Sequence, residues 1–453
     1  MLIRISFKKM GSSTKALTKA EIVQFGAGGG ASSAIFQFTT TYLLFFFTNI
    51  SGIEASQAAK LIFIMKLVDA IFDIAAGYII DKFDLRLGAG KYRPYIALFS
   101  PILGFSIYSL FAIDSGSSEL SSYLTYLSVV FFSISLSFCN MAYNGLTVKM
   151  TSHYDERASL ITFKQFIGIG VGFFASFLPL YISNYFGGGQ EGWRVTALLM
   201  AILVIALFYT SWFGSKNRDG SINHSEQGRE KISIGSYLTI LKQNKPLVAL
   251  MVCQSCFMFS VTLEGSTAIY FFIYYLNHES AFPIYQGLVV GISSLLILLA
   301  PRLIRYKDKK SIYVYSCKTA IVVLFIALYT VLYFPIPAGL LFLVCLKVLL
   351  VFSANLIWML LPDCVDYGKK KYGFSPAAAT QSLVTFFSKI FSGLGVLFAG
   401  IVLTYVGFEA ESTTITREMN LVFVIFKFFP ILLSLIISIL AMRHYSITRS
   451  NLY

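Results

Sequence analysis

Charged residues are scarce in this chain of 453 residues. Asp, Glu, Lys and Arg make up 13% of it, against the roughly 25% that is typical of soluble domains. Hydrophobic residues make up 56%, which excludes an ordinary soluble protein and indicates an integral membrane protein. The net charge is +14, but Lys and Arg lie between long apolar runs rather than on one face of a polar domain. This distribution is typical of membrane topology, so we expect a lipid bilayer and no nucleic acid as partner.

Histidine and cysteine are also scarce. The four His (153, 224, 278 and 444) fall in predicted loops or tails, which excludes a histidine proton relay inside the membrane. Cys253 and Cys256 form a CxxC pair with no second pair of ligands nearby, so we interpret the cysteines as small packing residues rather than a metal site or disulfide framework. No HExxH or GxSxG motif is present. We therefore expect neither an enzyme nor a cofactor.

Long apolar runs are abundant, and twelve have the length of about 20 residues that a membrane-spanning helix needs. They lie near 22–48, 56–80, 94–113, 121–148, 158–184, 193–213, 246–276, 283–304, 311–334, 337–362, 374–406 and 419–442. We predict an N-terminal tail (1–20), a first six-helix bundle (21–213), a central loop (214–245), a second six-helix bundle (246–442) and a C-terminal tail (443–453). The first 20 residues are basic and too polar for a signal peptide.

The connecting segments predict the orientation. One set is rich in Lys and Arg, with examples at 82–93, 302–310 and 369–371, whereas the alternate set is mostly acidic, with Glu54, Glu119 and Glu279. Basic segments stay in the cytoplasm. Both termini belong to the basic set, so both are predicted to be cytoplasmic, and an even number of spans such as twelve is required.

The two halves of the chain resemble each other. The segment KQFIGIG, which begins at Lys164, is followed 225 residues later by KIFSGLG, which begins at Lys389. A parallel repeat of six spans is the arrangement of the major facilitator superfamily, in which the substrate lies between the halves near the middle of the membrane. The sequence therefore predicts an all-α membrane protein of this fold, with two six-helix bundles.

The second apolar run carries three charges, on Lys66, Asp69 and Asp73. Each charge at the centre of a bilayer costs roughly 2.5–3.5 kcal/mol on insertion scales, which marks such residues as functional. Asp69 and Asp73 are four residues apart, so a helix places both carboxylates on one face. We interpret this run as a cation-binding helix that leads into a basic cytoplasmic turn.

Several segments together resemble the glycoside–pentoside–hexuronide:cation symporters, the family of the melibiose permease. They are YLLFFFTN from Tyr42, DAIFD from Asp69, GKYRP from Gly90, ERA from Glu156 and LPDCVDYG from Leu361. These segments keep the order of the family, and nearly its spacing, across almost the whole chain. The resemblance implies cation-coupled transport of a sugar or glycoside by alternating access.

The resemblance also implies a site for the coupling cation. Asp69 and Asp73 match its two aspartates, and Ser137 aligns with a threonine of that site and keeps the hydroxyl. Phe72 replaces the asparagine that supplies a further oxygen. Na⁺ favours several oxygen ligands, and this site has lost one of them. Paired carboxylates with few neutral ligands can bind a proton instead, so the coupling ion is either Na⁺ or H⁺.

The two aspartates that hold the sugar in the permease align here with Ser33 and Asn140. Relatives that resemble sulfoquinovose carriers have Asn at the second position, and the pair Lys164-Gln165 is also closer to them. Lys389 matches a family lysine near both sites. The lysines within the membrane outnumber the carboxylates there, which favours an anionic sugar such as a uronate or a sulfosugar.

Other polar and aromatic residues also lie at membrane depth. Glu264 either pairs with a lysine, binds substrate hydroxyls or titrates during transport, and Lys347 also lies within an apolar run, whereas Lys318 and Lys427 are expected to extend toward a membrane surface. Spans four and ten supply aromatic and amide groups that suit a sugar. The predicted substrate residues are Ser33, Lys66, Asn140, Tyr143, Asn144, Lys164, Gln165, Glu264, Trp358 and Lys389.

Charged residues at the cytoplasmic ends of the spans suggest a gate. Asp81, Arg93, Asp363 and Asp366 are placed where ion pairs could join the halves in one state and break in the other. We also leave open a carrier of an amphipathic lipid-like or drug-like solute with the same fold. The expected protein is a monomer in a cell membrane, the inner membrane of a bacterium.

Overall fold

The computed structural model describes residues 17–82, 90–113, 119–151, 154–216, 218, 242–372, 377–405 and 417–447. These residues form twelve long helices and no strand, which confirms the predicted all-α fold. The first half contains α1 (Lys19–Phe45), α2 (Ala55–Lys82), α3 (Arg93–Ala112), α4 (Glu119–Lys149), α5 (Tyr154–Tyr185) and α6 (Gly189–Gly214). The second half contains α8 (Lys245–Tyr270), α9 (Ala281–Tyr306), α10 (Lys309–Tyr333), α11 (Ile336–Tyr372), α12 (Ala377–Tyr405) and α13 (Arg417–Ala441).

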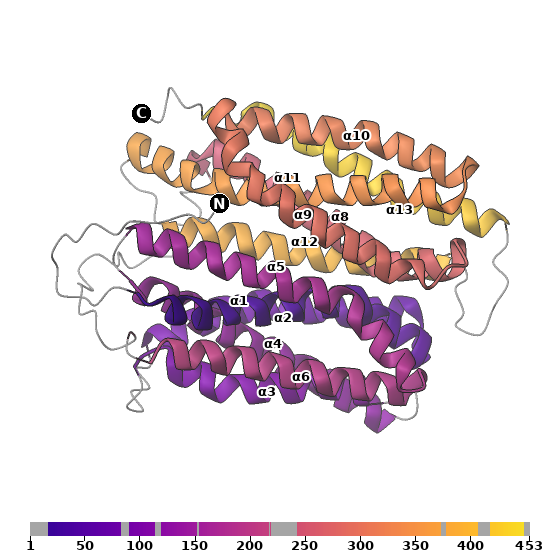
Figure 1. Cartoon of the computed structure of the whole chain (residues 1–453), viewed down its shortest axis with the longest axis horizontal. Helices are drawn as coiled ribbons and strands as arrows, with labels where there is room; N and C mark the ends of the chain where they lie inside the picture. Colours follow the sequence, from indigo (N-terminus) through magenta and orange to yellow (C-terminus); the bar gives the residue numbers. More distant parts are fainter. Residues whose placement is uncertain are drawn as a thin grey trace.

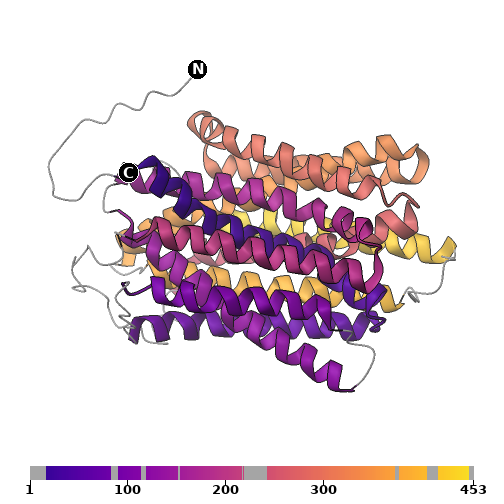
Figure 2. The same cartoon turned by 60° about the horizontal axis from the view of Figure 1, so that its bottom comes forward.

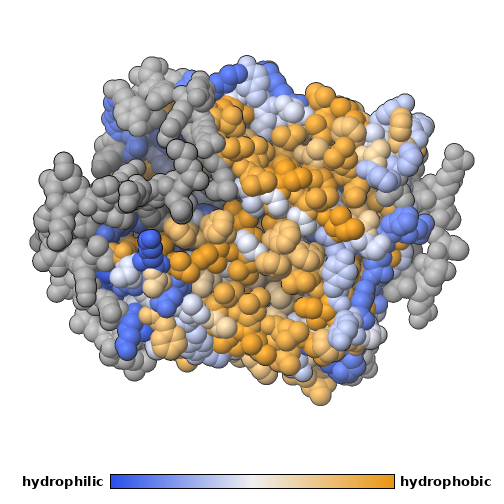
Figure 3. Space-filling view, viewed as in Figure 1, coloured by the Kyte–Doolittle hydropathy of each residue, from blue (hydrophilic) through white to orange (hydrophobic). Residues whose placement is uncertain are grey.

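The helices form two groups whose long axes run in a similar direction. Figure 1 shows α1 to α6 in one group and α8 to α13 in the other. α1 begins and α13 ends at the same end of the molecule in Figures 1 and 2, as an even number of crossings requires. Figure 3 shows an apolar band across the middle of one face, between polar ends. This is the surface expected of a protein that spans a bilayer.

Nine of the described helices contain a segment that is long and apolar enough to cross a membrane, and α1, α2 and α9 do not. The reason is clearest for α2, because Lys60, Lys66, Asp69 and Asp73 interrupt its apolar sequence. Helices of this kind are stable in a membrane when their polar faces lie against other helices. α2 packs against α4 in its own half and against α12 in the other.

Glycines allow α1 to approach α5 closely. A Cβ atom on Gly29 would lie 2.7 Å from the carbonyl oxygen of Lys164, and a Cβ on Gly26 would lie 2.7 Å from the Ile167 side chain. Small residues at such contacts are a common means of packing helices in membranes. The glycine cluster of α1 is therefore a packing surface against α5.

The repeat seen in the sequence also appears in the backbone. α1 continues into the π-helical segment η1 (Phe46–Ile50), and α8 continues into η2 (Phe271–Tyr275), 225 residues later. The third short element, η3 (Met442–His444), follows α13. The halves meet through α1 and α8, α2 and α12, and α5 and α9. The first of these pairs joins equivalent helices of the two repeats.

The interactions between the halves gather toward the predicted extracellular end. Lys389 joins the halves near the middle of the helices, and further hydrogen bonds between the halves lie nearer to that end. The contacts nearer to that end are Thr48 with Tyr270 (2.5 Å between hydroxyls), Asn49 Nδ2 with the Tyr274 hydroxyl, Asn184 Nδ2 with Glu279 Oε1 (3.0 Å), and Ser266 Oγ with the Thr40 carbonyl (3.3 Å). The structure is therefore closed at its predicted extracellular end.

Candidate functional site

Two buried carboxylates of one half share an ammonium group of the other half. Asp69 and Asp73 lie one turn apart on α2 and are 5% and 9% exposed. Lys389, on α12, lies with Nζ 2.9 Å from Asp69 Oδ2 and donates a hydrogen bond to Asp73 Oδ2. This ion-pair triad forms a polar link between α2 and α12. A charge state that weakens it also weakens the contact between the two halves.

One oxygen atom of the triad has no hydrogen-bond partner. Ser137, which is buried on α4, donates from Oγ to Asp69 Oδ1 over 3.0 Å, as expected for the aligned hydroxyl of the cation site. Asp73 Oδ1 is buried and bonded to no other described residue. A buried acceptor without a donor is costly. This oxygen, together with Asp69 and the Ser137 hydroxyl, therefore offers ligands to a proton or a small cation.

Lys66, the third charged residue of α2 in this region, is not part of the triad. It is half-buried, and its ammonium lies 5.8 Å from the centre of the Phe36 ring. Within the described part of the chain, it forms no ion pair with either aspartate. The carboxylates are instead bridged by Lys389, from a helix more than 300 residues away in the sequence. Phe72 is half-buried beside Asp73 and brings no oxygen atom to the site.

A second polar group lies on α4 and α5. Lys164 donates from Nζ to Asn144 Oδ1 over 3.0 Å, and its ammonium lies 4.5 Å from the centre of the Tyr143 ring. Tyr143 itself is buried, and its hydroxyl donates to the Phe25 carbonyl over 3.0 Å. No carboxylate of the described residues forms an ion pair with Lys164. Tyr143 therefore supports Lys164, while the ammonium and the exposed Asn144 remain available to a ligand.

On α1, the contact with Asn140 is made by the neighbour of the predicted Ser33. Ser32, and not Ser33, donates to Asn140 Oδ1 over 2.7 Å. Ser33 lies against α5, where a Cβ on Gly168 would be 2.9 Å from its hydroxyl oxygen. The structure brings Ser32 rather than Ser33 to Asn140, because adjacent helix positions differ by about 100° in direction, and the role of Ser33 stays a prediction. The available signal was the pair of consecutive serines.

The remaining predicted substrate residues are less constrained. Gln165 is exposed on α5, and Trp358, on α11, is 37% exposed. Neither side chain makes a hydrogen bond to another described residue. Their place at the site stays a prediction.

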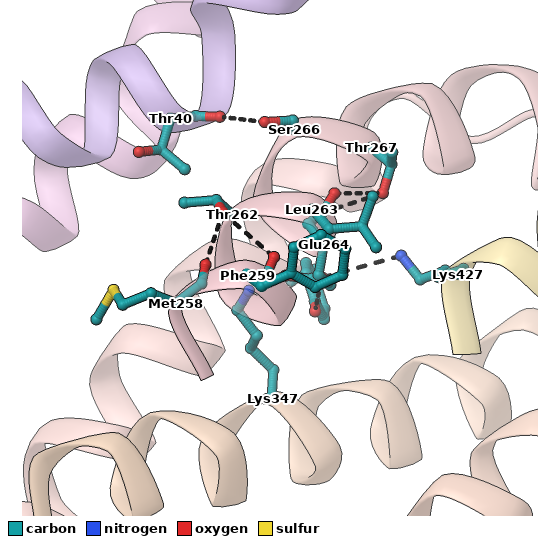
Figure 4. Close-up of polar contacts among 11 residues, drawn as sticks. Thr40, Met258, Phe259, Thr262, Leu263, Glu264, Ser266, Thr267, Lys347 and Lys427 are labelled. Carbon is teal, nitrogen blue, oxygen red and sulfur yellow. Dashed lines mark hydrogen bonds and ion pairs between the residues drawn. The ribbon is translucent and has the colours of Figure 1, made fainter. Parts of the chain in front are cut away.

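Glu264 belongs to a separate cluster inside the second half. Lys347, on α11, donates a hydrogen bond to Glu264 Oε2, and the Tyr285 hydroxyl, on α9, donates to Oε1 over 2.8 Å. Lys427, on α13, lies 3.9 Å from Oε1 (Figure 4). The expectation that Lys427 extends to a membrane surface is wrong, because the residue is 5% exposed and points toward Glu264. Its apolar neighbours in sequence gave no sign of this partner.

Two of the predicted gate residues, Arg93 and Asp363, contact residues of their own halves. Lys309 Nζ donates to both carboxylate oxygens of Asp363, over 2.7 and 2.8 Å. Arg93 is buried against the ring of Trp212 and donates to its carbonyl oxygen. Asp366 is exposed, and the side chain of Asp81 lies outside the described residues. A latch between the halves is therefore a prediction for the other conformation.

The sequence matches the MFS/sugar transport protein family over residues 24–449. Among curated proteins, the chain is 26% identical to the uncharacterized symporter YnaJ of Bacillus subtilis, over 97% of this chain and 94% of that protein. It is 26% identical to the isoprimeverose transporter of Lactiplantibacillus pentosus, over 88% and 83%. It is 25% identical to the putative sulfoquinovose importer of Escherichia coli, over 87% and 84%.

Solved structures support the same fold. The crystal structure of the nucleoside transporter NupG superposes with a TM-score of 0.64 at 13% identity, over 95% of this chain and all of the other. The predicted symporter family and the predicted fold are both confirmed. The chain is a member of the MFS/sugar transport protein family and thus a multi-pass membrane transporter rather than an enzyme.

Proposed function

We propose that this protein is a symporter that couples the entry of a sugar or glycoside to a monovalent cation, Na⁺ or H⁺. The observation that carries the proposal is the triad, in which Lys389 of one half holds Asp69 and Asp73 of the other. Asp69, Asp73 and the Ser137 hydroxyl bind the cation. The link between ion and conformation is then direct, because the same carboxylates bind the ion and hold α2 to α12.

The triad suggests how binding of the ion changes the site. Two carboxylates and one ammonium leave a net negative charge, which Lys66 balances only from a distance. A cation bound at Asp73 Oδ1 takes over part of the role of Lys389, which frees the ammonium to meet a substrate group. Cation and substrate then favour each other's binding through a difference in affinity between states.

The substrate that the site suits best is an anionic sugar. Lys164 offers a cation without a carboxylate partner among the described residues, and Asn144, Asn140 and Ser32 offer groups for hydroxyls. Trp358 offers a ring face, and Gln165 a further amide. Relatives named as isoprimeverose and sulfoquinovose carriers support a sugar. They favour it over the amphipathic solute that the sequence left open.

The remaining features follow from this mechanism. The halves 21–213 and 246–442 move as two units, and Asp81, Arg93, Asp363 and Asp366 join them when the cytoplasmic end closes. The protein acts as a monomer, with its basic loops in the cytoplasm. Its named relatives come from bacteria, which supports the cytoplasmic membrane of a bacterium as its location.

Uptake into proteoliposomes tests the proposal. A panel of neutral glycosides, uronates and sulfosugars is offered with an inward Na⁺ gradient and then with an inward proton gradient. We expect accumulation of an anionic sugar with one of the two gradients. Strong uptake of neutral glycosides without competition from anionic ones would reject the anionic substrate, and equal uptake without any gradient would reject coupling.

A further inference from the structure

The cluster around Glu264 is the most buried group of charges among the described residues. Glu264 is 4% exposed, Lys347 8%, Lys427 5% and Tyr285 2%. They come from four different helices, α8, α11, α13 and α9. All lie in the second half of the molecule, and none contacts Asp69, Asp73 or Lys389. The proposed cation and sugar sites therefore leave this cluster without a role.

The contacts of the two lysines differ. Lys347 donates a hydrogen bond to Glu264, and the pair is further held by the Tyr285 hydroxyl. Lys427 lies 3.9 Å from Glu264 Oε1, too far for a hydrogen bond, with its ammonium 4.3 Å from the centre of the Phe271 ring. These are its polar contacts within the described chain. The ammonium of Lys427 is therefore held less closely by Glu264 than that of Lys347.

The charges of the cluster do not balance. With both lysines protonated and Glu264 ionised, the cluster has a charge of +1. The Asp69–Asp73–Lys389 triad has the opposite imbalance and faces Lys66. A surplus charge at membrane depth is unfavourable unless it is paired. In the closed arrangement, the cluster is neutral when one lysine has released its proton.

The helices packed against α8 bring no other charge to this point within the described structure. α1 contributes Thr40 and α12 contributes the Ser392 carbonyl, which bonds Thr262. Lys389 of α12 is held by the aspartates. Arg443 and His444 lie in η3, which packs against the cytoplasmic end of α8. The proton balance of the cluster therefore depends on Glu264, Lys347 and Lys427, with Tyr285 as hydrogen-bond donor.

The cluster adjoins the closed extracellular end. Six residues after Glu264, Tyr270 bonds Thr48 of η1, and within η2 Tyr274 bonds Asn49. Phe271, whose ring faces Lys427, is the first residue of η2. A movement that separates α8 from α1 therefore moves the surroundings of Lys427 and admits water to them.

We propose that Glu264, Lys347 and Lys427 form a proton-binding site, separate from the aspartate pair, that takes up one proton when the extracellular end opens. The ligand is a proton, and no bond other than N–H forms. In the closed arrangement one amine is neutral, and on opening, water stabilises the second ammonium. Proton binding then favours the open extracellular end, and closing releases the proton.

Trp193 is a built-in reporter for this site. It is 2% exposed, and its ring lies 6.2 and 6.1 Å from those of Phe45 and Phe46, beside the contact of α1 with α8. A variant with W212F and W358F keeps it as the single tryptophan. Its emission is recorded against pH in lipid nanodiscs, without sugar and without an ion gradient.

We expect a single-proton transition in the parent, its loss in K427M, and its retention in K318M, which removes an exposed lysine of α10. It should also be retained in D73N. An absent transition in the parent, or an unchanged one in K427M, overturns the proposal. Loss in D73N assigns the proton to the aspartate pair and also overturns it, while leaving the proposed coupling intact. Dependence on chloride rather than pH shows a bound anion instead.

Thermal stability supplies a second measurement in case a variant folds poorly. K427M leaves the balanced pair of Glu264 and Lys347, so its unfolding midpoint should equal or exceed that of the parent at neutral pH. E264Q leaves two lysines without a carboxylate and should lower the midpoint. If K427M is destabilised as strongly as E264Q, Lys427 is a structural member of an ion-pair network and the proposal is wrong.

Discussion

Lys164 and Lys389 occupy equivalent positions in the two halves, yet their surroundings differ. Lys389 faces α2 and bridges two carboxylates, whereas Lys164 contacts Asn144 and the ring of Tyr143. The helix that corresponds to α2 is α9, where Ser294 and Leu298 stand at the positions equivalent to Asp69 and Asp73. The scaffold is therefore repeated, but only one copy carries the acids. One lysine is left to serve the cation site and the other to serve a ligand.

The largest effect is expected when one of the acids that distinguish the halves is neutralised. D73N takes away one of two charged ligands, which lowers cation affinity by roughly a hundred-fold, the factor that corresponds to about 3 kcal/mol. Concentrative uptake in proteoliposomes should disappear, while exchange of labelled for unlabelled sugar continues. D308N, at an exposed aspartate before α10, is the matched control and should transport normally. Normal accumulation by D73N would remove the aspartate pair from coupling.

Replacing each of the equivalent lysines, Lys164 and Lys389, by methionine should distinguish their roles. K389M leaves two buried carboxylates without their ammonium, and breaking a buried pair in this way costs about 3–5 kcal/mol. We therefore expect a clear fall in the unfolding midpoint and a loss of transport. K164M breaks no ion pair among the described residues, so its stability should remain close to that of the parent.

Measurements of sugar affinity should separate the same two variants, K389M and K164M. K164M loses a charge-assisted hydrogen bond worth about 1.5–3 kcal/mol, which lowers affinity for an anionic sugar by roughly ten- to a hundred-fold. Affinity for the matching neutral sugar should hardly change. The measurement is calorimetric or fluorescence binding to purified protein. Equal losses for both sugars would show that Lys164 does not bind the anionic group.

The comparison also predicts an intermediate effect when an acid is added to the second half. S294D places a carboxylate on α9 at the position equivalent to Asp69, next to α5. It should pair with Lys164 and lower affinity for an anionic sugar by about ten-fold, near 1.4 kcal/mol. S294N, which adds an amide of the same size at the same position but no charge, is the control. The same loss in both variants would reject the proposed equivalence.

The smallest expected effect concerns the extracellular closure, which both halves share. Y274F removes the hydroxyl that accepts a hydrogen bond from Asn49, worth about 1 kcal/mol, so the open population should rise roughly five-fold. Spin labels at the exposed Gln57 and Ser280 report the opening as a longer distance. Y329F, at an exposed tyrosine of α10, should leave the distances unchanged. No change in Y274F would show that this bond does not hold the gate closed.

The sequence predicted the fold well because the fold depends on regular patterns. Apolar length predicted the helices, and the 225-residue repeat predicted which helices correspond. The spacing of Asp69 and Asp73 was enough to place both acids on one face of α2. These features depend on local periodicity, which a single sequence contains.

Contacts between distant helices were harder to predict. Lys66 is closer to Asp69 in sequence, but Lys389 makes the ion pair because the packing of α2 on α12 brings it there. Lys427 appeared to be a surface lysine because its partner, Glu264, lies on another helix. Ser32 was passed over for Ser33, since alignment does not resolve direction around a helix. Each of these contacts depends on orientation relative to a partner, and therefore on tertiary structure.

The matched π-helical segments η1 and η2 have a consequence for the history of the molecule. Each π-helical turn adds about one residue to the regular α-helix, and an addition at the same point of both halves is most simply inherited from a single ancestral half. The contact of Asn49 with Tyr274, which joins the two segments at equivalent residues, then descends from a symmetric pairing of identical units. The contact that closes the extracellular end is in that sense older than the difference in function between the two halves.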